Sequence, residues 1–192
     1  MKLLLIDTTA DRLLVATKND DKVVCEFGNG EKGSTSSSII PTIQRVLTRS
    51  ELSVKEIDCV FAVVGPGSFT GIRIGVCTAQ SIAFGIGRPS SSLTVFDGFA
   101  HDGLCVIPSR RGYCYYSLRG EYGEKSIDEI TSADDVFYRY MELPFGTRVS
   151  DETYVSDLFA VAEKKYSAEE FTSLEPMYLK QSQAERMRKE KK

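Results

Sequence analysis

The stretch that decides the fold is Val64-Gly65-Pro66-Gly67-Ser68-Phe69-Thr70-Gly71-Ile72-Arg73-Ile74-Gly75. It follows a nearly continuous apolar run, residues 57–64, which is typical of a strand covered on both faces. Two glycines around a proline favour a tight turn, and Ser68 or Thr70 can cap the helix that follows, to about residue 85. Such a turn either binds an anion or only reverses the chain. The glycine spacing matches neither a Walker A loop nor a Rossmann motif.

Upstream of this stretch, the sequence predicts an antiparallel meander and a helix. Three short apolar strands are expected over Lys2–Asp7, Arg12–Lys18 and Lys22–Phe27, with a hairpin turn between the second and third. A helix is expected over about residues 38–49, and any of the small hydroxyl residues Ser34–Ser38 could cap it. If Ser38 is the cap, Pro41 lies in the first turn. Periodicity alone gives an α/β protein with a mixed sheet, and the order of the elements resembles the start of the ribonuclease H-like domain of actin, Hsp70 and sugar kinases.

Downstream, the pattern predicts a second, shorter set of strands and helices. The expected elements are a loop over Arg88–Ser92, a short helix over Leu93–Ala100, strands over Gly103–Pro108, Gly112–Leu118 and Glu121–Ile127, and helices near Ala133–Leu143 and Ser156–Tyr166. A second meander followed by helices indicates a reduced repeat of the first half. We therefore expect a boundary near residues 91–101, with a first domain over 1–100 and a smaller one over 101–192.

The composition is that of a folded protein with a mildly acidic surface. The chain has 192 residues, 42% of them hydrophobic, and a net charge of −3, so the molecule as a whole is not expected to bind polyanions. The end, Ala184–Lys192, is basic and is either a solvated helix end or a tail that contacts RNA. No apolar stretch reaches the length of a membrane span and no secretory leader is visible, so we expect a cytoplasmic protein without a membrane partner.

Cysteine and histidine usage argues against a metal site. The cysteines are odd in number and none has CxxC spacing, so we expect buried free thiols in a reducing compartment. They are Cys25, Cys59, Cys77, Cys105 and Cys114. The single histidine, His101, follows an apolar stretch and is interpreted as a helix-end or core residue. We expect no metal and no other cofactor.

The helix after the glycine turn carries a ridge of small residues. Gly71, Gly75, Ala79 and Ala83 fall at every fourth position. Glycine inside a helix costs roughly 1 kcal/mol relative to alanine, so Gly75 requires a compensating close approach by another element. That element is either the chain's own sheet or first helix, or a helix of a partner subunit.

With these segments in hand, the sequence resembles the TsaB (YeaZ) family. The matching segments are Leu5-Ile6-Asp7-Thr8-Thr9, Ile39-Ile40-Pro41-Thr42-Ile43, the glycine stretch quoted first, and Glu175-Pro176-Met177-Tyr178-Leu179-Lys180. The resemblance is strong over residues 1–100, thin over 101–170 and returns near the end. The chain departs from the family at Thr35-Ser36-Ser37, where a His-Ser pair is common, and at Pro108-Ser109-Arg110-Arg111, where an Asp-Ala-Arg-like segment is usual.

The resemblance implies an actin-like, ribonuclease H-like (ASKHA) fold of two domains, each with a mixed sheet and the second reduced. It also implies a non-catalytic partner, or pseudoenzyme, of the enzyme TsaD in forming N6-threonylcarbamoyladenosine at position 37 of tRNA. The resemblance implies that TsaD carries out the chemistry and that an ATPase of the TsaE type binds to the same complex. In the free protein a second copy of this chain could take the place of TsaD. The tRNA would be contacted indirectly, through the complex. The expected partner contacts are Ile39, Ile43, Val46, Leu47, Arg73, Gly75, Ala79 and Ile82.

The competing interpretation is an actin-fold phosphotransferase or ATPase. Its anion or nucleotide turn would consist of Asp7, Thr8, Gly65, Gly67, Ser68, Thr70 and Gly71. Against it, residues 101–192 contain no second glycine-rich phosphate loop. Direct tRNA binding through Arg110, Arg111 and the basic tail is a separate hypothesis. No catalytic residue is assigned.

Overall fold

The computed structural model describes residues 1–28, 35–130 and 135–179, and the basic tail expected at Ala184–Lys192 lies outside these ranges. The chain forms two compact units. Of the described residues, the first unit contains Met1–Ala100 and Ser150–Met177, and the second contains His101–Val149 with Tyr178 and Leu179.

A mixed five-stranded sheet forms the centre of the first unit, with the strand order β3-β2-β1-β4-β5. The strands are β1 (Lys2–Asp7), β2 (Leu14–Asn19), β3 (Lys22–Phe27), β4 (Cys59–Val63) and β5 (Ser90–Leu93). The first three are antiparallel, whereas β4 pairs parallel with both β1 and β5. The meander and the buried fourth strand predicted from the sequence are thus confirmed.

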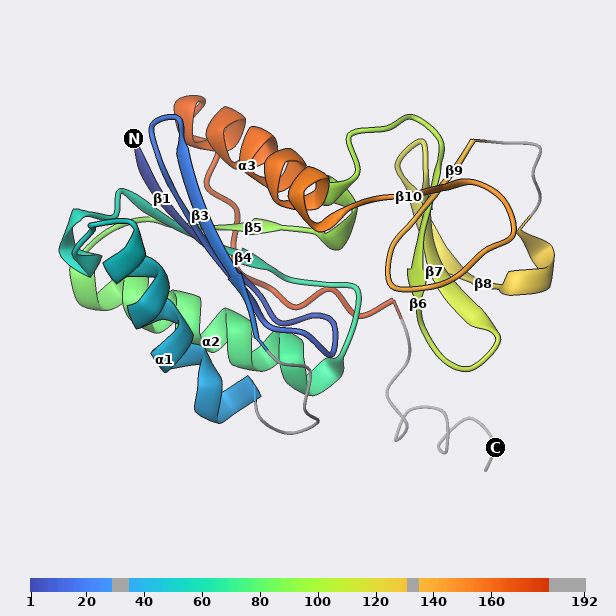
Figure 1. The fold of residues 1–192 in the computed structure, drawn as a ribbon, viewed down its shortest axis with the longest axis horizontal. Helices are drawn as coiled ribbons and strands as arrows, with labels where there is room; N and C mark the ends of the chain where they lie inside the picture. Colours follow the sequence, from blue (N-terminus) through green and yellow to red (C-terminus); the bar gives the residue numbers. More distant parts are fainter. Residues whose placement is uncertain (29–34, 131–134, 180–192) are drawn as a thin grey trace. The chain divides into compact units, whose positions relative to one another are not determined.

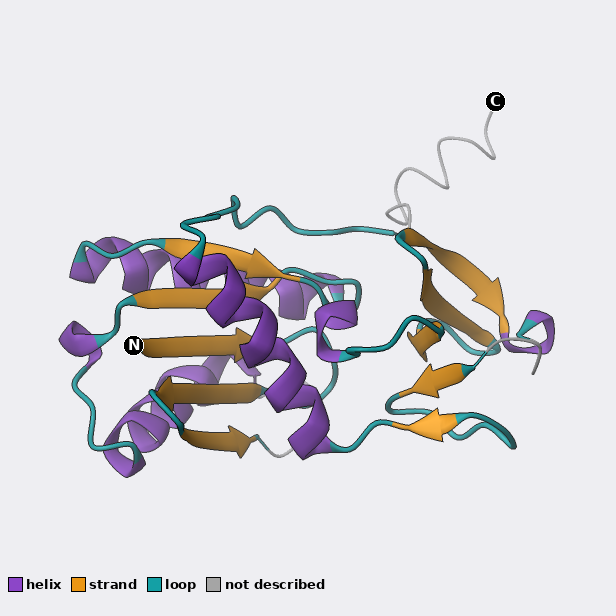
Figure 2. Cartoon of the chain, turned by 90° about the horizontal axis from the view of Figure 1, so that it is seen from above, coloured by secondary structure: helices purple, strands orange, loops and turns teal. Residues whose placement is uncertain are grey.

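Helices cover both faces of this sheet (Figures 1 and 2). Two of them, α1 (Thr35–Arg49) and α2 (Phe69–Ile86), pack on one face, and α3 (Asp151–Ser167) packs on the other. Because side chains alternate along a strand, Leu4 and Ile6 of β1 join the core under α1 and α2. All described residues of β1 and β4 except Lys2 are buried, as their apolar sequences predict.

Two local predictions in this unit differ from the structure. α1 begins at Thr35, about three residues before the expected start but within the run 34–38 from which the cap was expected, so Pro41 lies inside the helix and not in its first turn. Residues 90–92, expected as part of a loop, and Leu93, expected to begin a short helix, form the edge strand β5 beside β4. The strand was missed because Ser90, Ser91 and Ser92 have a low strand propensity. In the structure the hydroxyl groups of Ser91 and Ser92 both contact Thr172 Oγ1, at 3.1 and 2.7 Å.

The second unit contains another five-stranded sheet, ordered β10-β9-β6-β7-β8. Its strands are β6 (Leu104–Pro108), β7 (Tyr113–Leu118), β8 (Glu121–Ser126), β9 (Val136–Tyr138) and β10 (Thr147–Arg148). The helix predicted near 133–143 was wrong in the residues described: Val136–Tyr138 is a strand, paired parallel with β6. Three consecutive β-branched and aromatic residues favour that outcome.

The second domain was expected to run from residue 101 to 192, but residues 150–177 pack in the first unit. The reason is the buried face of α3, which carries Tyr154, Val155, Leu158, Phe159 and Ala162. These side chains cover the sheet face that α1 and α2 leave open. Sequence periodicity finds such a helix without showing which sheet it covers.

Among the helices described, α2 is long and apolar enough to cross a membrane by length and composition. The core helix of a folded domain passes the same test. In this structure Gly71, Ile72, Gly75, Val76, Ala79 and Ala83 are its buried residues, and they face the sheet.

Candidate functional site

The carboxylate that ends β1 is bound on both oxygens by its own chain. Asp7 Oδ1 accepts hydrogen bonds from the backbone N–H of Thr9 at 2.8 Å and from the Thr9 hydroxyl at 2.6 Å. Asp7 Oδ2 accepts one from the Tyr154 hydroxyl of α3 at 2.8 Å. Asp7 is 3% exposed and Tyr154 is fully buried. The Asp7 carboxylate therefore links the end of β1 to α3. In the competing interpretation, an actin-fold phosphotransferase would use a carboxylate at this position to bind its ligand.

The two threonines that follow are bound to the start of α2. The Thr8 hydroxyl donates to the carbonyl of Gly71 at 2.7 Å, and the N–H of Ser68 donates to the carbonyl of Thr9 at 2.6 Å. Ser68 caps α2, with its side chain accepting from the N–H of Gly71 at 3.2 Å. Two backbone N–H groups at the start of α2, those of Ser68 and Gly71, therefore already donate hydrogen bonds to acceptors of the same chain.

The glycines of the motif are explained by the same close approach. A Cβ on Gly67 would collide with the carbonyl of Thr9, and one on Gly71 with the carbonyl of Thr8. A Cβ on Gly75 would collide with the Thr8 hydroxyl. Of the two explanations left open by the sequence, packing against the chain's own elements is the one that the structure shows for Gly75.

The C-terminal segment also reaches this turn. The N–H of Met177 donates to the carbonyl of Val64 at 2.7 Å, and Leu174 is buried in the core beneath α1 and α2. Gly65 has a φ of +130°, and a Cβ there would collide with the carbonyl of Met177. Met177 of the family segment at 175–180 therefore belongs to the same structural junction as the glycine motif.

The structure thus brings the predicted nucleotide turn together, but as a packed junction. Asp7, Thr8, Gly65 and Gly71 are buried in it, whereas Ser68 and Thr70 are exposed at the start of α2. Gly67 lies between these extremes. Sequence reasoning missed Tyr154, because it lies in the first turn of α3, before Ser156, where the predicted helix began.

The predicted partner contacts lie mostly in the core. Six of the eight are buried in their own unit: Ile39, Ile43, Val46, Leu47, Gly75 and Ala79. Arg73 is exposed and Ile82 is half-buried. An amphipathic helix turns its apolar side to its own sheet, which explains the burial of these six. Their assignment as partner contacts stays a prediction, and the side of the helices that solvent reaches is the opposite one.

The opposite side carries large apolar groups, and we call it the outer face of α1 and α2. On α1, Ile40 is 49% exposed. On α2, Phe69 is 42% and Phe84 is 92% exposed, and Cys77 lies exposed between them. Arg73, Cys77 and Phe84 recur at helical spacing along α2, so they share one side of that helix.

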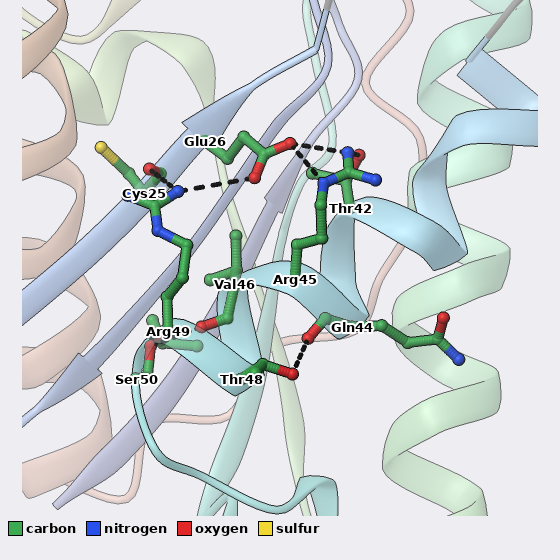
Figure 3. A network of polar contacts seen from close by, with 10 residues as sticks. Cys25, Glu26, Thr42, Gln44, Arg45, Val46, Thr48, Arg49 and Ser50 are labelled. Carbon is green, nitrogen blue, oxygen red and sulfur yellow. Dashed lines mark hydrogen bonds and ion pairs between the residues drawn. The ribbon is translucent and has the colours of Figure 1, made fainter.

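Beside α1, two arginines converge on one carboxylate (Figure 3). Glu26 of β3 accepts from Nε and Nη2 of Arg45 at 2.9 and 2.6 Å, and lies 3.5 Å from Nη1 of Arg49. Arg45 also donates to the Thr42 hydroxyl at 2.9 Å. Both guanidinium groups are about half exposed, so these pairs add little stability, but they fix two positive charges at the edge of α1.

Three of the five thiols are buried, as the sequence predicted, whereas Cys25 is only half-buried. Burial raises the pKa of Cys59 and of Cys105 to about 12, and that of Cys114 to about 11. Cys77, by contrast, is exposed. His101 is also exposed rather than a core residue, and its ring stacks on Phe137 with 3.8 Å between the centroids.

Within the part of the chain that the structure describes, no three His, Cys, Asp or Glu side chains gather in a way that could hold a metal ion.

In the second unit, the guanidinium of Arg110 lies 3.5 Å from the centre of the Tyr113 ring and pairs with Glu124 at 3.5 Å.

The topology of the first unit, with its two-sided helical cover, defines an α/β protein of the actin-like, ribonuclease H-like class. Two solved structures share the fold. "YeaZ from Pseudomonas aeruginosa" superposes with a TM-score of 0.68 at 19% identity, and a second structure from that organism, described as similar to peptidase YeaZ, with 0.71 at 17%. Both alignments cover 93% of this chain and 99% of the other.

Sequence comparison identifies the family. The model of the family TsaD, tRNA N6-adenosine threonylcarbamoyltransferase, matches residues 33–155. Proteins named tRNA threonylcarbamoyladenosine biosynthesis protein TsaB are 30% identical over 143 residues in Bacillus subtilis and 35% over 126 residues in Escherichia coli, which is 71% and 61% of this chain. The chain therefore belongs to this family, in its TsaB (YeaZ) branch. The matched regions span 62% and 54% of the two relatives.

Proposed function

We propose that this chain takes part in forming N6-threonylcarbamoyladenosine at position 37 of tRNA, as a non-catalytic partner of a TsaD-type enzyme. The names of its relatives indicate the pathway. The outer face of α1 and α2 is the surface on which the enzyme would dock. In this proposal a TsaE-type ATPase joins the complex, tRNA is met through the enzyme, and the site of action is the cytoplasm.

The observation that carries the proposal is the exposure of Phe84. At 92% it is the most exposed of the large hydrophobic side chains described, and it shares its side of α2 with Cys77. Burying a phenylalanine is worth roughly 1.5–3 kcal/mol, so a partner that covers this side chain gains substantial affinity. Aromatic anchors of this kind are typical of the centre of a protein interface.

The engagement of Asp7 supports a non-catalytic role. An actin-fold phosphotransferase needs this carboxylate and the neighbouring hydroxyl for its ligand. Here Asp7 accepts from Thr9 and Tyr154, and the Thr8 hydroxyl donates to Gly71. Using these groups for catalysis would require breaking buried hydrogen bonds, which counts against the competing interpretation.

Reconstitution tests the proposal. The TsaD-type enzyme of the same organism is supplied with threonylcarbamoyl adenylate and tRNA, and the modified nucleoside is measured with and without this chain. We expect modification to depend on the chain, and to fall when Phe84→Ser replaces the wild type.

The matched control is Phe171→Ser. Phe171 is a second exposed phenylalanine, 42% exposed, but its ring contacts Tyr166 of α3, the helix on the other face of the sheet. Full modification without this chain, or equal losses for the two variants, would refute the proposal.

A further inference from the structure

The segment that follows α3 crosses the edge of the first sheet (Figure 1). Residues 168–177 contain no helix or strand, and we call them the strap. The strap starts at α3 on one face of the sheet, whereas its Leu174 is buried in the core under α1 and α2, on the other face. Between these two points it passes β5, the edge strand, which Thr172 contacts. The strap therefore joins the two helical layers at this edge.

Side chains of the strap and of α3 cover the free edge of β5. The carbonyl of Leu93 faces β4 and accepts from the N–H of Val64 at 2.8 Å. Because the backbone groups of neighbouring strand residues point to opposite edges, those of Ser92 face away from β4. The Ser92 N–H donates to Thr172 Oγ1 at 3.3 Å, and the Ser92 carbonyl accepts from Lys165 Nζ of α3 at 2.8 Å. The edge is thus satisfied at Ser92 without a further strand.

One buried side chain anchors the strap. Leu174 is 5% exposed and is the one buried residue of the strap, all of which the structure describes, while Met177 packs half-buried on the same core. The N–H of Thr172 donates to Ser91 Oγ at 3.0 Å, in a position that is partly open to water. Opening the strap therefore exposes far less apolar surface than unfolding the whole unit does. Segments of this kind open locally in folded proteins.

The end of the strap contacts the turn that leads into α2. The N–H of Met177 donates to the carbonyl of Val64 at 2.7 Å, and its own carbonyl lies where a Cβ on Gly65 would be. This turn ends at Ser68, the N-cap of α2, and Phe69 of the outer face follows directly. Because Met177 packs against one side of the turn, the position of the strap and that of the start of α2 are coupled.

We propose that the strap opens and closes as one unit while the sheet stays folded, and that its closed position holds the start of α2 in place for docking. The part about docking rests on the proposed function and adds a conformational control to it. A partner that binds only the closed form has an apparent affinity reduced in proportion to the closed fraction. Opening of the strap would therefore weaken docking without any change of a residue on the outer face.

Native-state hydrogen exchange, followed by NMR, tests the local opening. We expect the amides of Thr172 and Met177 to have similar protection factors, about a hundredfold or more below those of Leu5 and Phe61 in the sheet. Leu5 is fully buried in β1, so Leu5→Val should speed exchange at Phe61 and leave the two strap amides within about twofold. Equal acceleration at Thr172 and Met177 would mean that the strap opens only when the unit unfolds, and would overturn the proposal.

A second variant holds the strap open. Leu174→Asp would bury an unpaired carboxylate in the closed form, so the open form is favoured. Ser173→Asp adds the same charge at the neighbouring exposed position and is the matched control. In Leu174→Asp we expect Thr172 and Met177 to lose nearly all protection, while the sheet amides stay about a hundredfold or more above them. Loss of protection in the sheet as well would overturn the proposal.

The same variant tests the connection to α2. The amide of Ile72, which donates to the carbonyl of Ser68 at 2.9 Å, should exchange about tenfold faster in Leu174→Asp. The dissociation constant for the TsaD-type enzyme, measured by calorimetry, should rise about tenfold or more, against less than about twofold in Ser173→Asp.

The outcomes distinguish this inference from the proposed function. Unchanged exchange at Ile72, or unchanged enzyme binding while Thr172 and Met177 are unprotected, overturns the inference and leaves the proposed function intact. Absence of enzyme binding in the wild type overturns the proposed function and the docking role of the strap. The exchange measurements then still decide whether the strap opens as a unit and holds the start of α2.

Discussion

Replacing Tyr154 with phenylalanine removes one oxygen from the centre of the first unit. The lost hydroxyl donates to Asp7 Oδ2 at 2.8 Å, and neither residue has meaningful contact with water. Hydrogen bonds to charged groups contribute about 1.5–3 kcal/mol, and an unsatisfied buried acceptor costs a similar amount. Thr9 keeps its two bonds to Oδ1, so only one oxygen loses its partner.

We therefore expect Tyr154→Phe to lower the free energy of unfolding by about 2 kcal/mol. In a chain of 192 residues this corresponds to a fall of about 4–8 °C in melting temperature. Urea denaturation followed by circular dichroism measures the first quantity and calorimetry the second. Tyr166→Phe, on the same helix, is the matched control and should change the unfolding free energy by less than about 0.5 kcal/mol.

A loss below about 0.5 kcal/mol in Tyr154→Phe would refute this reasoning, because Asp7 would then not depend on its own chain. Tighter binding of ATP with magnesium in the variant would point the same way, since it would mean that Tyr154 occupies a ligand site.

Four further outcomes follow from the same structure. Gly75→Ala should lower stability by about 1–3 kcal/mol in urea despite the better helix propensity of alanine, because its Cβ meets the Thr8 hydroxyl; a stabilised variant would contradict the packing described. Phe84→Ser should change the unfolding free energy by less than about 0.5 kcal/mol while weakening enzyme binding about tenfold, and a large loss of stability would mean that this side chain serves the fold. Cys77 should react with a thiol reagent in the folded protein, whereas Cys59 should react only after unfolding, which mass mapping of the labelled peptides checks. Burial raises the pKa of Cys59 to about 12 from 9.0, so the thiol loses its proton more easily in the unfolded chain and stability falls as the pH rises above 9. Cys59→Ala should therefore reduce the fall in the denaturation midpoint between about pH 8 and pH 10. A midpoint that falls as steeply with pH as in the wild type would count against burial of this thiol.

Much of the first unit could be predicted from the sequence, because its strands and helices have strong local patterns. The strands at 2–7 and 22–27 match their predicted bounds, and Ser68 caps α2 as one of two predicted candidates. β5 could not be predicted because its pairing depends on β4 and its hydroxyls depend on Thr172, which is far away in the sequence.

The site was harder to predict, because the same residues fit two interpretations. A glycine motif beside an Asp-Thr turn is compatible with a ligand and with close packing. Only the position of the Thr8 and Thr9 carbonyls against Gly71 and Gly67 decides between them. Likewise, apolar periodicity identified the buried side of α1 and α2, which packs on the sheet. It could not identify Phe84, because a single exposed apolar residue creates no repeating pattern.

The central claim is that this chain contributes a docking surface and leaves the reaction to its partner. The most direct measurement is the initial rate of tRNA modification in the reconstituted system with Asp7→Asn, at a temperature where circular dichroism shows the variant folded. The account predicts a rate within about twofold of the wild type, since asparagine keeps the shape and an acceptor oxygen. A loss of about a hundredfold or more, with the complex still formed, is what removing a catalytic carboxylate would produce, and it would contradict the account.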